Sequence, residues 1–327
     1  MLGRRAVLGW IGAASATPDL ALARPLPQPD PALWDPQGFA MAEGRAAGPN
    51  GSVYYRRYGE AGRVPVIALH GGPAAGHRYL RPYAALAHDR QVVFYDQSGC
   101  GLSDAPKDLS LYTLDRYVAE LEAVRAALGF EKVVLLGHSW GGMLAPAYAA
   151  AYPNHVQALV LAGTGVRWRD FQEAAQIWLR QLGPGAVATV ARAEHGGSTD
   201  DPAYGALMER YYSLHLCRLN PPPAWFNAEG ETLGRNPVYA YLNGPSEFQF
   251  TGAFAGLDNT QALKGVRAPT LITCGEFDEG PPLVARRIAA LVLGAQVKVF
   301  DGLSHMSHIE DPRRVTDATA AFLSRTA

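Results

Sequence analysis

One serine stands in a pattern that is typical of nucleophilic catalysis. Residues 137–142 read GHSWGG, which has the form G-x-S-x-G, with an apolar run before them and a helix-like run of small residues after them. In this strand–turn–helix context the turn lifts the serine hydroxyl out of the sheet, next to the positive end of a helix. Small neighbours are needed because the turn is tight. The pattern predicts that Ser139 is a nucleophile.

A serine hydroxyl is a weak nucleophile, so it needs a base that an acid orients. In folds with this turn the acid and then the histidine follow the serine along the chain. Beyond Ser139, His195 and His215 fall in a segment that we expect to lie outside the sheet, whereas His305 and His308 follow a predicted strand. His305 is nearer to the end of that strand, so we favour it over His308 as the base.

The acid is less sharply defined by the sequence. Asp278 follows the predicted strand Thr270–Cys274 through a short turn, which places it where an orienting carboxylate belongs. Glu276 and Glu279 lie in the same turn, and spacing alone does not exclude either of them.

The tetrahedral intermediate of acyl transfer also needs two backbone N–H donors. One is expected from Trp140, directly after the nucleophile, and the other from the run HGGP at residues 70–73, with Gly72 as the donor. We expect His70 and His138 to be structural and to brace their loops by local hydrogen bonds.

The elements that must position these residues alternate between strand and helix. Such alternation predicts an α/β fold with a mostly parallel central sheet and helices on both faces. The predicted strands are Phe39–Arg45, Ser52–Tyr58, Val64–Leu69, Gln91–Tyr95, Lys132–Leu136, Val156–Leu161, Thr270–Cys274 and Gln296–Phe300. The predicted helices are Tyr79–Ala87, Thr113–Leu128, Met143–Ala151, Leu283–Leu293 and Pro312–Leu323.

The alternation is interrupted over residues 167–256, which are rich in aromatic and helix-like stretches and have no convincing buried strand. We therefore predict an α/β core formed by residues 39–166 and 257–327, with residues 167–256 as a helical cap. Ligands of open α/β sheets bind at the carboxyl edge of the strands, and the cap is expected to cover that edge.

The N-terminus differs from the rest of the chain. Arg4 and Arg5 precede a short apolar run and small residues, a pattern that resembles a twin-arginine export signal over residues 1–23. The proline-rich residues 24–38 then form a linker. The expected location is periplasmic or secreted, with the cytoplasm as the alternative. No segment has the roughly 20 apolar residues that a membrane-spanning helix needs.

Charge and cysteine content narrow the class of protein further. With 29 basic and 30 acidic residues the formal net charge is −1, so nothing favours nucleic acid or an anionic membrane as a partner. Three scattered cysteines suggest reduced thiols rather than a disulfide framework. No run has the spacing of a metal site, and we expect neither a metal nor an organic cofactor.

Taken together, these runs resemble the proline iminopeptidase family, which comprises prolyl aminopeptidases and related amino-acid amidases within the α/β-hydrolase superfamily. The resemblance covers about residues 39–325. The runs that carry it are HGGP (70–73), DQSGCGLS (96–103), GHSWGG (137–142), NGPSEF (243–248), GEFDE (275–279), SHM (304–306) and EDP (310–312).

The resemblance implies a serine aminopeptidase that releases an N-terminal residue from a small peptide or an amino-acid amide. It supports Asp278 as the acid, and it implies that the carboxylates of Glu247 and Glu279 bind the free α-amino group. Charge-assisted hydrogen bonds to a protonated amine agree with that role. Ala74 stands where the family usually has glycine, and Ser98 where its proline-specific members commonly have arginine.

Two alternative functions remain at this level. An esterase or lactonase would use the same triad without recognising an amine, and it would also accept N-acetylated substrates. A non-catalytic binding protein that kept the fold would not react with a fluorophosphonate probe.

Overall fold

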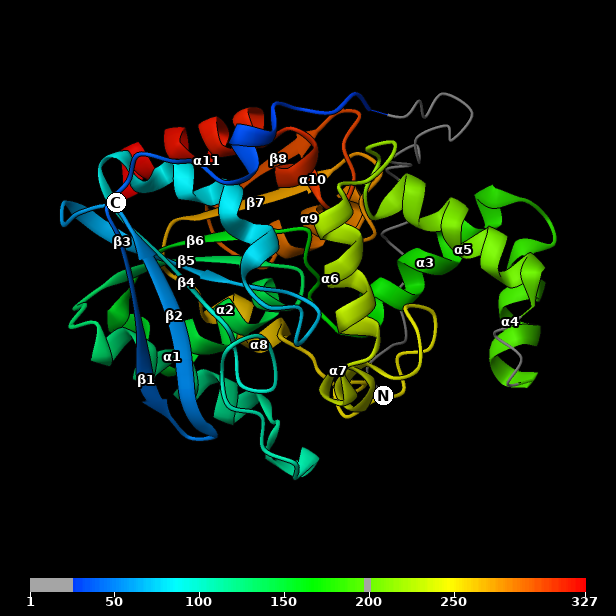
Figure 1. The fold of residues 1–327 in the computed structure, drawn as a ribbon, viewed down its shortest axis with the longest axis horizontal. Helices are drawn as coiled ribbons and strands as arrows, with labels where there is room; N and C mark the ends of the chain where they lie inside the picture. The colour runs from blue at the N-terminus through cyan, green and yellow to red at the C-terminus, as the bar shows by residue number, and fades with distance from the viewer. Residues whose placement is uncertain (1–25, 197–200) are drawn as a thin grey trace, which may run out of the picture.

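The computed structural model describes residues 26–196 and 201–327, so the predicted export signal lies outside the described residues. The described strands form one sheet of eight in the order β1-β2-β4-β3-β5-β6-β7-β8 (Figure 1). The pairs β1–β2 and β2–β4 are antiparallel, and all the others are parallel. The mostly parallel sheet predicted from the alternating pattern is confirmed.

The strands run as follows: β1 Met41–Gly48, β2 Gly51–Tyr58, β3 Arg63–Leu69, β4 Arg90–Tyr95, β5 Val133–His138, β6 Val156–Ala162, β7 Thr270–Gly275 and β8 Gln296–Phe300. The helices of the α/β core are α1 Leu114–Ala127, α2 Trp140–Ala151, α8 Thr260–Gly265, α9 Pro282–Ala289, α10 Ser307–Glu310 and α11 Pro312–Thr326. Short 3-10 helices are η2 Pro31–Trp34, η3 Arg78–His88, η4 Leu109–Leu111 and η5 Pro153–His155.

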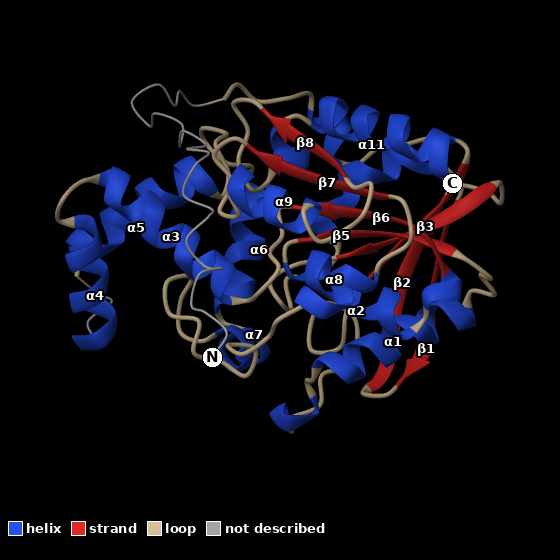
Figure 2. Ribbon diagram, turned by 180° about the vertical axis from the view of Figure 1, so that it is seen from behind, coloured by secondary structure: helices blue, strands red, loops and turns tan. Residues whose placement is uncertain are grey.

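The central strands are apolar on both faces because helices cover both. In β3, Val66 and Ala68 belong to a cluster with η3 and α11, while Ile67 and Leu69 belong to a cluster with α1, α2 and α9. Figure 2 shows α11 on one side of the sheet and α1, α2 and α8 on the other. Alternate side chains of a strand point to opposite faces, so a strand buried on both faces reads as the continuous apolar run seen in the sequence.

Two predicted helices differ from the structure at their ends or in their type. The segment predicted as a helix over Tyr79–Ala87 is the 3-10 helix η3, with Pro82 inside it. Proline has no N–H to donate and clashes with the preceding turn of an α-helix, so the tighter form is favoured. Helix α2 begins at Trp140, three residues before the predicted Met143, because Ser139 is already its N-cap.

Between β6 and β7 the chain forms a separate group of helices. They are α3 Arg169–Leu182, α4 Ala186–Gly196, α5 Pro202–His215, α6 Ala224–Gly234 and α7 Pro237–Asn243. Side chains of α3, α4 and α5 form a hydrophobic cluster of their own that includes Trp178, Leu179 and Tyr211. In Figure 1 these helices lie at one end of the sheet, with α6 nearest to it. This is the segment that the sequence predicts as a cap.

The segment before β1 packs on the folded core. Trp34 donates from Nε1 to the carbonyl of Ile309 at 2.8 Å, and Leu26 forms a bridge with Leu219 in the loop before α6. No helix within residues 26–196 or 201–327 is long and apolar enough to cross a membrane.

The turn after β5 depends on glycine for space, which gives a stability prediction. A Cβ at Gly137 would lie 2.2 Å from the carbonyl oxygen of Gly141, so Gly137→Ala must displace backbone. We expect a loss of at least about 2 kcal/mol, at the upper part of the range for overpacked cores, read as a lower thermal unfolding midpoint. Gly256→Ala is the control, because its Cβ would meet nothing within 4 Å. Equal midpoints for the two variants would contradict this view of the turn.

Candidate active site

Ser139 lies in the turn between β5 and α2 with φ 56° and ψ −120°. Among the residues that the structure describes, only Ser139 and Ala74 combine a side chain with a positive φ. Such a conformation costs about 1–3 kcal/mol and persists only where the surroundings enforce it. The neighbouring loop is close enough that a Cβ at Gly71 would lie 2.8 Å from the Cβ of Ser139. The turn therefore has the strained geometry that the sequence motif predicts.

The structure brings Asp278 and His305 together from the loops after β7 and β8. His305 donates from Nδ1 to Asp278 Oδ1 at 2.7 Å, and both side chains are buried. The carboxylate also accepts hydrogen bonds from the backbone N–H of Gly280 at 2.9 Å and of Gly275 at 3.2 Å. These bonds fix the carboxylate, and through it the imidazole ring.

The other acids of this turn are placed differently. Glu276 accepts the backbone N–H of Gly302 at 2.8 Å and so holds the loop after β8. Glu279 lies on the other edge of the imidazole, with Oε2 3.9 Å from Nε2 of His305. Of the three candidates that spacing left open, Asp278 is the one hydrogen-bonded to Nδ1.

Burial by itself lowers the pKa of His305, but nearby charges outweigh it. The charge and hydrogen bond of Asp278, followed by the charges of Glu279 and Glu247, raise the pKa of His305 to about 9. The imidazole therefore holds its proton more strongly than a free histidine, and a change of charge at the two glutamates would alter its basicity.

The remaining histidines named by the sequence are engaged elsewhere. His308 donates from Nε2 to the carbonyl of Tyr79 at 3.2 Å and stacks on Tyr83, and burial lowers its pKa to about 3. His215 donates from Nδ1 to the carbonyl of Phe277 at 2.8 Å. The side chain of His195 lies outside the described residues. The geometry thus favours His305 as the partner of Asp278.

Ser139 and His305 line one cavity of about 120 Å³ at the carboxyl edge of the sheet. Its walls combine the loop at Gly72 with carboxylates and aromatic rings from the helical segment. Its lining also includes Trp168, Phe171, Leu216, Phe226, Glu229, Gly230, Leu233, Glu247, Phe250, Glu279 and Met306.

His138 connects the nucleophile turn to both neighbouring loops. The backbone N–H of Gly71 donates to the hydroxyl of Tyr79 at 2.6 Å, and this hydroxyl donates to Nδ1 of His138 at 2.9 Å. Nε2 of His138 donates to the carbonyl of His305 at 3.0 Å. Burial holds the pKa of His138 well below its usual value, so the ring stays neutral. The predicted brace exists, but it reaches distant loops, and nothing in the sequence marked Tyr79.

A second brace joins the two loops predicted to supply the backbone donors. Gln97 donates from its backbone N–H to Nε2 of His70 at 3.0 Å and from its side chain to the carbonyl of His70 at 3.0 Å. Its side-chain oxygen accepts Nε1 of Trp140 at 2.8 Å. Burial lowers the pKa of His70 to about 4, which keeps the ring able to accept.

The two predicted donors suit their role by position. Trp140 is the first residue of α2, where backbone N–H groups have no partner within the helix. Gly72 lines the cavity with φ 109°, and a Cβ there would lie 2.7 Å from the N of Ala75. Only glycine fits that bend of the loop.

The carboxyls of Glu247 and Glu279 face the same cavity. Tyr239 donates its hydroxyl to Glu247 Oε1 at 2.9 Å, while Oε1 of Glu279 is buried with no hydrogen-bond partner in the described part of the chain. Burial, then the neighbouring charge of Glu247, raises the pKa of Glu279 well above its usual range. Burial also raises the pKa of Glu247, against the hydrogen bond from Tyr239. Both carboxyls would gain from a cation placed between them.

A third carboxyl of the cavity carries no sequence motif. Glu229 of α6 lines it and lies 3.2 Å, through Oε1, from Nε of Arg78 in η3. Burial raises the pKa of Glu229. This ion pair joins α6 to the core, and a lone glutamate in a helical pattern gave no means of predicting it.

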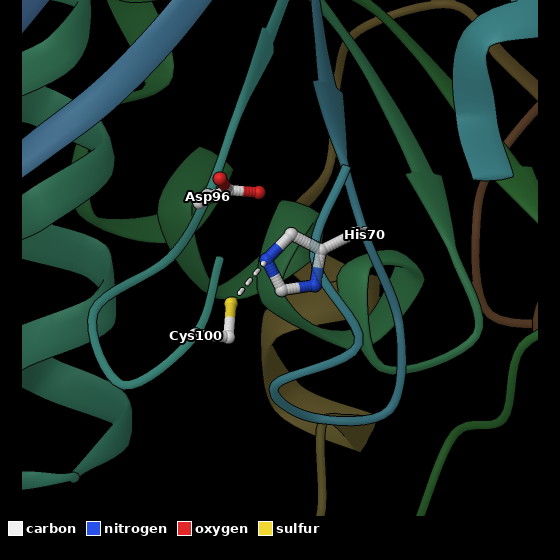
Figure 3. A group of neighbouring side chains, drawn as sticks. All are labelled: His70, Asp96 and Cys100. Atoms are coloured by element: carbon white, nitrogen blue, oxygen red, sulfur yellow. Dashed lines mark hydrogen bonds between the residues drawn. The ribbon is translucent and has the colours of Figure 1, made fainter. Parts of the chain in front are cut away.

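Within the described ranges, one group of side chains has the composition and spacing of a metal site. It consists of His70, Asp96 and Cys100, all buried (Figure 3). Each candidate ligand atom already has a protein partner. Asp96 accepts from both the backbone N–H and Nδ1 of His77 and from Leu102, the Cys100 thiol donates to the carbonyl of Gln97, and Nε2 of His70 accepts from Gln97. The group is explained as a brace of the loop after β4.

If Asp278 orients His305, Asp278→Asn should lower kcat for ester hydrolysis by about 10³–10⁴-fold while the thermal unfolding midpoint changes little. The amide cannot accept in the same way, so the imidazole is no longer held as a base. Asp301→Asn, at an exposed loop position, is the matched control. A loss of less than tenfold in the Asp278 variant would argue against this role.

Comparison with known proteins agrees with this geometry. Residues 64–312 match the family model described as the alpha/beta hydrolase fold. The chain is 35% identical over 275 residues to the proline iminopeptidase of Heyndrickxia coagulans, covering 84% of this chain and 96% of that protein. The crystal structure of the proline iminopeptidase of Mycobacterium smegmatis superposes with a TM-score of 0.81 at 32% identity, covering 87% of this chain and 98% of that one.

The crystal structure of VinJ is similar to the same extent, with a TM-score of 0.82 at 30% identity over 88% of this chain and 99% of that one. Both structural matches cover most of this chain and nearly all of the other chain. The chain therefore belongs to the α/β-hydrolase fold and, within it, to the proline iminopeptidase family.

Proposed function

We propose that this chain is a serine aminopeptidase that releases an N-terminal residue, proline or another small or apolar one, from small peptides or amino-acid amides. The observation that carries the proposal is the pair of carboxyls, Glu247 and Glu279, on the cavity that Ser139 and His305 also line. A protonated α-amine bound between them would be held by charge-assisted hydrogen bonds in a largely dry site. An ester or lactone has no group that needs such a pair.

In this proposal the reaction follows the acyl-enzyme route. Ser139 attacks the first carbonyl as His305 takes its proton, and Asp278 keeps the imidazole in the required orientation. The N–H groups of Trp140 and Gly72 hold the oxyanion. His305 then gives its proton to the leaving nitrogen, and a water activated by the same base releases the acyl group from Ser139.

The binding of the amine also prepares the base. In the free protein the charges of Glu279 and Glu247 help to raise the pKa of His305 to about 9. A bound ammonium adds a positive charge beside the imidazole, which lowers the pKa of His305 when a correct substrate is in place. An N-acetylated substrate brings no positive charge and leaves the raised pKa of His305 as it is. Recognition and activation therefore depend on the same two carboxyls.

The walls of the cavity favour a compact first residue. Trp168, Phe171 and Phe250 supply an apolar side next to the carboxyl pair, and the cavity of about 120 Å³ is small for a ligand site. Ser98, which stands at the arginine position of proline-specific relatives, is buried and donates its N–H to Glu120 at 3.1 Å, and it is not among the lining residues. The arginine that accompanies strict proline preference is therefore missing, and we expect any selection of the first side chain to come from the aromatic wall.

Export remains part of the proposal. The support for it is Arg4-Arg5 with the apolar run that follows, and the protein would then be periplasmic or secreted. N-terminal sequencing of the protein secreted by its host would show whether residues 1–23 are removed.

The function is tested with aminoacyl naphthylamides of proline and alanine, each with a free or an acetylated amine. Free-amine substrates should be cleaved at least 100-fold faster than acetylated ones, because only they pair with the carboxyls. Glu247→Gln should lower kcat/KM for the free-amine set by about 10–100-fold, the equivalent of one charge-assisted bond, and leave hydrolysis of a simple ester much less affected. The surface variant Glu131→Gln is the control. Equal turnover of acetylated substrates would instead indicate an esterase.

A pH profile tests the electrostatic part. With a neutral ester, which has no amine to titrate, kcat/KM should rise with pH through about 9, because the free imidazole of His305 is the active form. Glu279→Gln removes a negative charge that raises this pKa, so the rising limb should move to lower pH by about one unit. Glu131→Gln should leave the limb in place. A limb that does not move in the Glu279 variant would show that Glu279 carries no charge beside His305.

A further inference from the structure

A second cavity adjoins the catalytic one, and its occupant is not explained by the triad or by the carboxyl pair. It has a volume of about 950 Å³ and lies between α5, α6 and the loop that joins them. Leu216, Phe226, Gly230, Leu233 and Glu247 line both cavities. The two cavities therefore meet along α6, whose residues line each of them.

The chemistry of the triad decides which part of a substrate points toward this shared lining. His305 must protonate the leaving nitrogen, so the leaving part of the substrate lies on the His305 side of the scissile bond. The loop that carries His305 is hydrogen-bonded to the chain segment where the lining of the second cavity continues from α5. The backbone N–H of His305 donates to the carbonyl of His215 at 3.0 Å, and that of Met306 donates to the carbonyl of Leu216 at 2.9 Å. From Leu216 the lining continues along the chain through Cys217, Arg218 and Leu219.

The sizes of the two cavities also suit different parts of a peptide substrate. The catalytic cavity, at about 120 Å³, is well below the roughly 300–1,000 Å³ of sites that enclose drug-sized ligands, while the second cavity is within that range. One amino-acid residue suits the first space and several residues suit the second. Trp168, Phe171 and Phe250 line the catalytic cavity alone, whereas Leu216, Phe226 and Leu233 line both cavities. A peptide chain that continues beyond the scissile bond would therefore leave the catalytic cavity where the two linings meet.

We infer that the second cavity is the binding site for the residues that follow the scissile bond, and that this protein acts on peptides of several residues rather than on dipeptides and amides alone. This inference rests on the aminopeptidase function proposed above. The lining supports a peptide as the occupant: Glu209, Arg210, Arg218 and Glu231 place charges of both signs on its walls beside the apolar Leu214 and Leu219. A lipid chain would be poorly matched by such walls, whereas a peptide has backbone polar groups and side chains to satisfy both kinds of surface.

Gly230 and Gly234 allow the inference to be tested without a clash. A Cβ at either position would meet nothing within 4 Å, so a side chain can begin there without meeting the backbone, and both substitutions remove a glycine from helix α6. Gly230 borders both cavities, and Gly234 borders only the second. Gly205 of α5 is the matched control, because its Cβ would also meet nothing within 4 Å and it does not line either cavity.

The experiment compares kcat/KM for alanine amide with kcat/KM for a tetrapeptide that begins with alanine, from initial rates on the full chain. For the wild type we expect the tetrapeptide value to exceed the amide value at least tenfold, because only the tetrapeptide contacts the second cavity. Gly230→Phe and Gly234→Phe should each lower the ratio of tetrapeptide to amide at least tenfold, and Gly205→Phe should leave it within twofold.

Other outcomes distinguish a failure of the second cavity as a binding site from a failure of the aminopeptidase function. If the wild type hydrolyses alanine amide but gains nothing from chain length, or if both α6 variants leave the ratio unchanged, the second cavity is not the binding site and the aminopeptidase function still stands. If the wild type hydrolyses an ester through Ser139 but neither the amide nor the tetrapeptide, both proposals are overturned.

Discussion

The whole site depends on a backbone turn in which a residue with a side chain, Ser139, has a positive φ. Ser139 is held at φ 56° between a strand and a helix, at a cost of about 1–3 kcal/mol. The surrounding packing enforces it, since β5 is buried along its length and lies between β3 and β6 in the parallel sheet. The glycines on either side are a consequence of that constraint: a Cβ at Gly141 would lie 2.1 Å from the carbonyl oxygen of Leu69. The position of the hydroxyl is therefore set by the core of the fold.

Four buried histidines lie near the carboxyl edge of the sheet, and their pKa values are shifted in different directions. His70, His138 and His308 are buried without a carboxylate on the ring, so desolvation keeps them neutral and suited to hydrogen bonding. His305 is equally buried, yet its pKa is raised because Asp278 and two further carboxyls surround it. Burial and charge act in opposite directions, and only at His305 does charge prevail. The neutral rings hold the surrounding loops: His138 donates to the carbonyl of His305, His308 donates to that of Tyr79, and His70 accepts from Gln97.

The carboxyls of the cavity join the fold to the helical segment over it. Glu279 comes from the loop after β7, Glu247 from the loop after α7, and Glu229 from α6, where it meets Arg78 of the core. Amine recognition, as proposed, requires the first two to face one small cavity, so the helical segment has to sit in a fixed place over the strand ends. Its own hydrophobic cluster, together with the hydrogen bond from Trp178 Nε1 to the carbonyl of Asp278 at 3.0 Å, supplies that placement.

The sequence by itself determined the parallel sheet, the nucleophile turn and the order in which its partners follow, because these depend on local patterns: apolar runs of strand length, glycines at a turn and loops that end strands. Local patterns did not identify a residue's role where that role depends on the position of its side chain in the folded protein. Spacing could not separate Asp278 from Glu276 and Glu279. Three-dimensional packing separates them, since one carboxylate reaches Nδ1 of His305, one reaches the N–H of Gly302 and one faces the cavity. Tyr79, Gln97 and Glu229 have roles that no sequence motif predicts, and their contacts form only when the fold brings distant segments of the chain together. Hydrogen bonds and ion pairs between loops depend on the folded arrangement, so they produce no periodic pattern in the sequence.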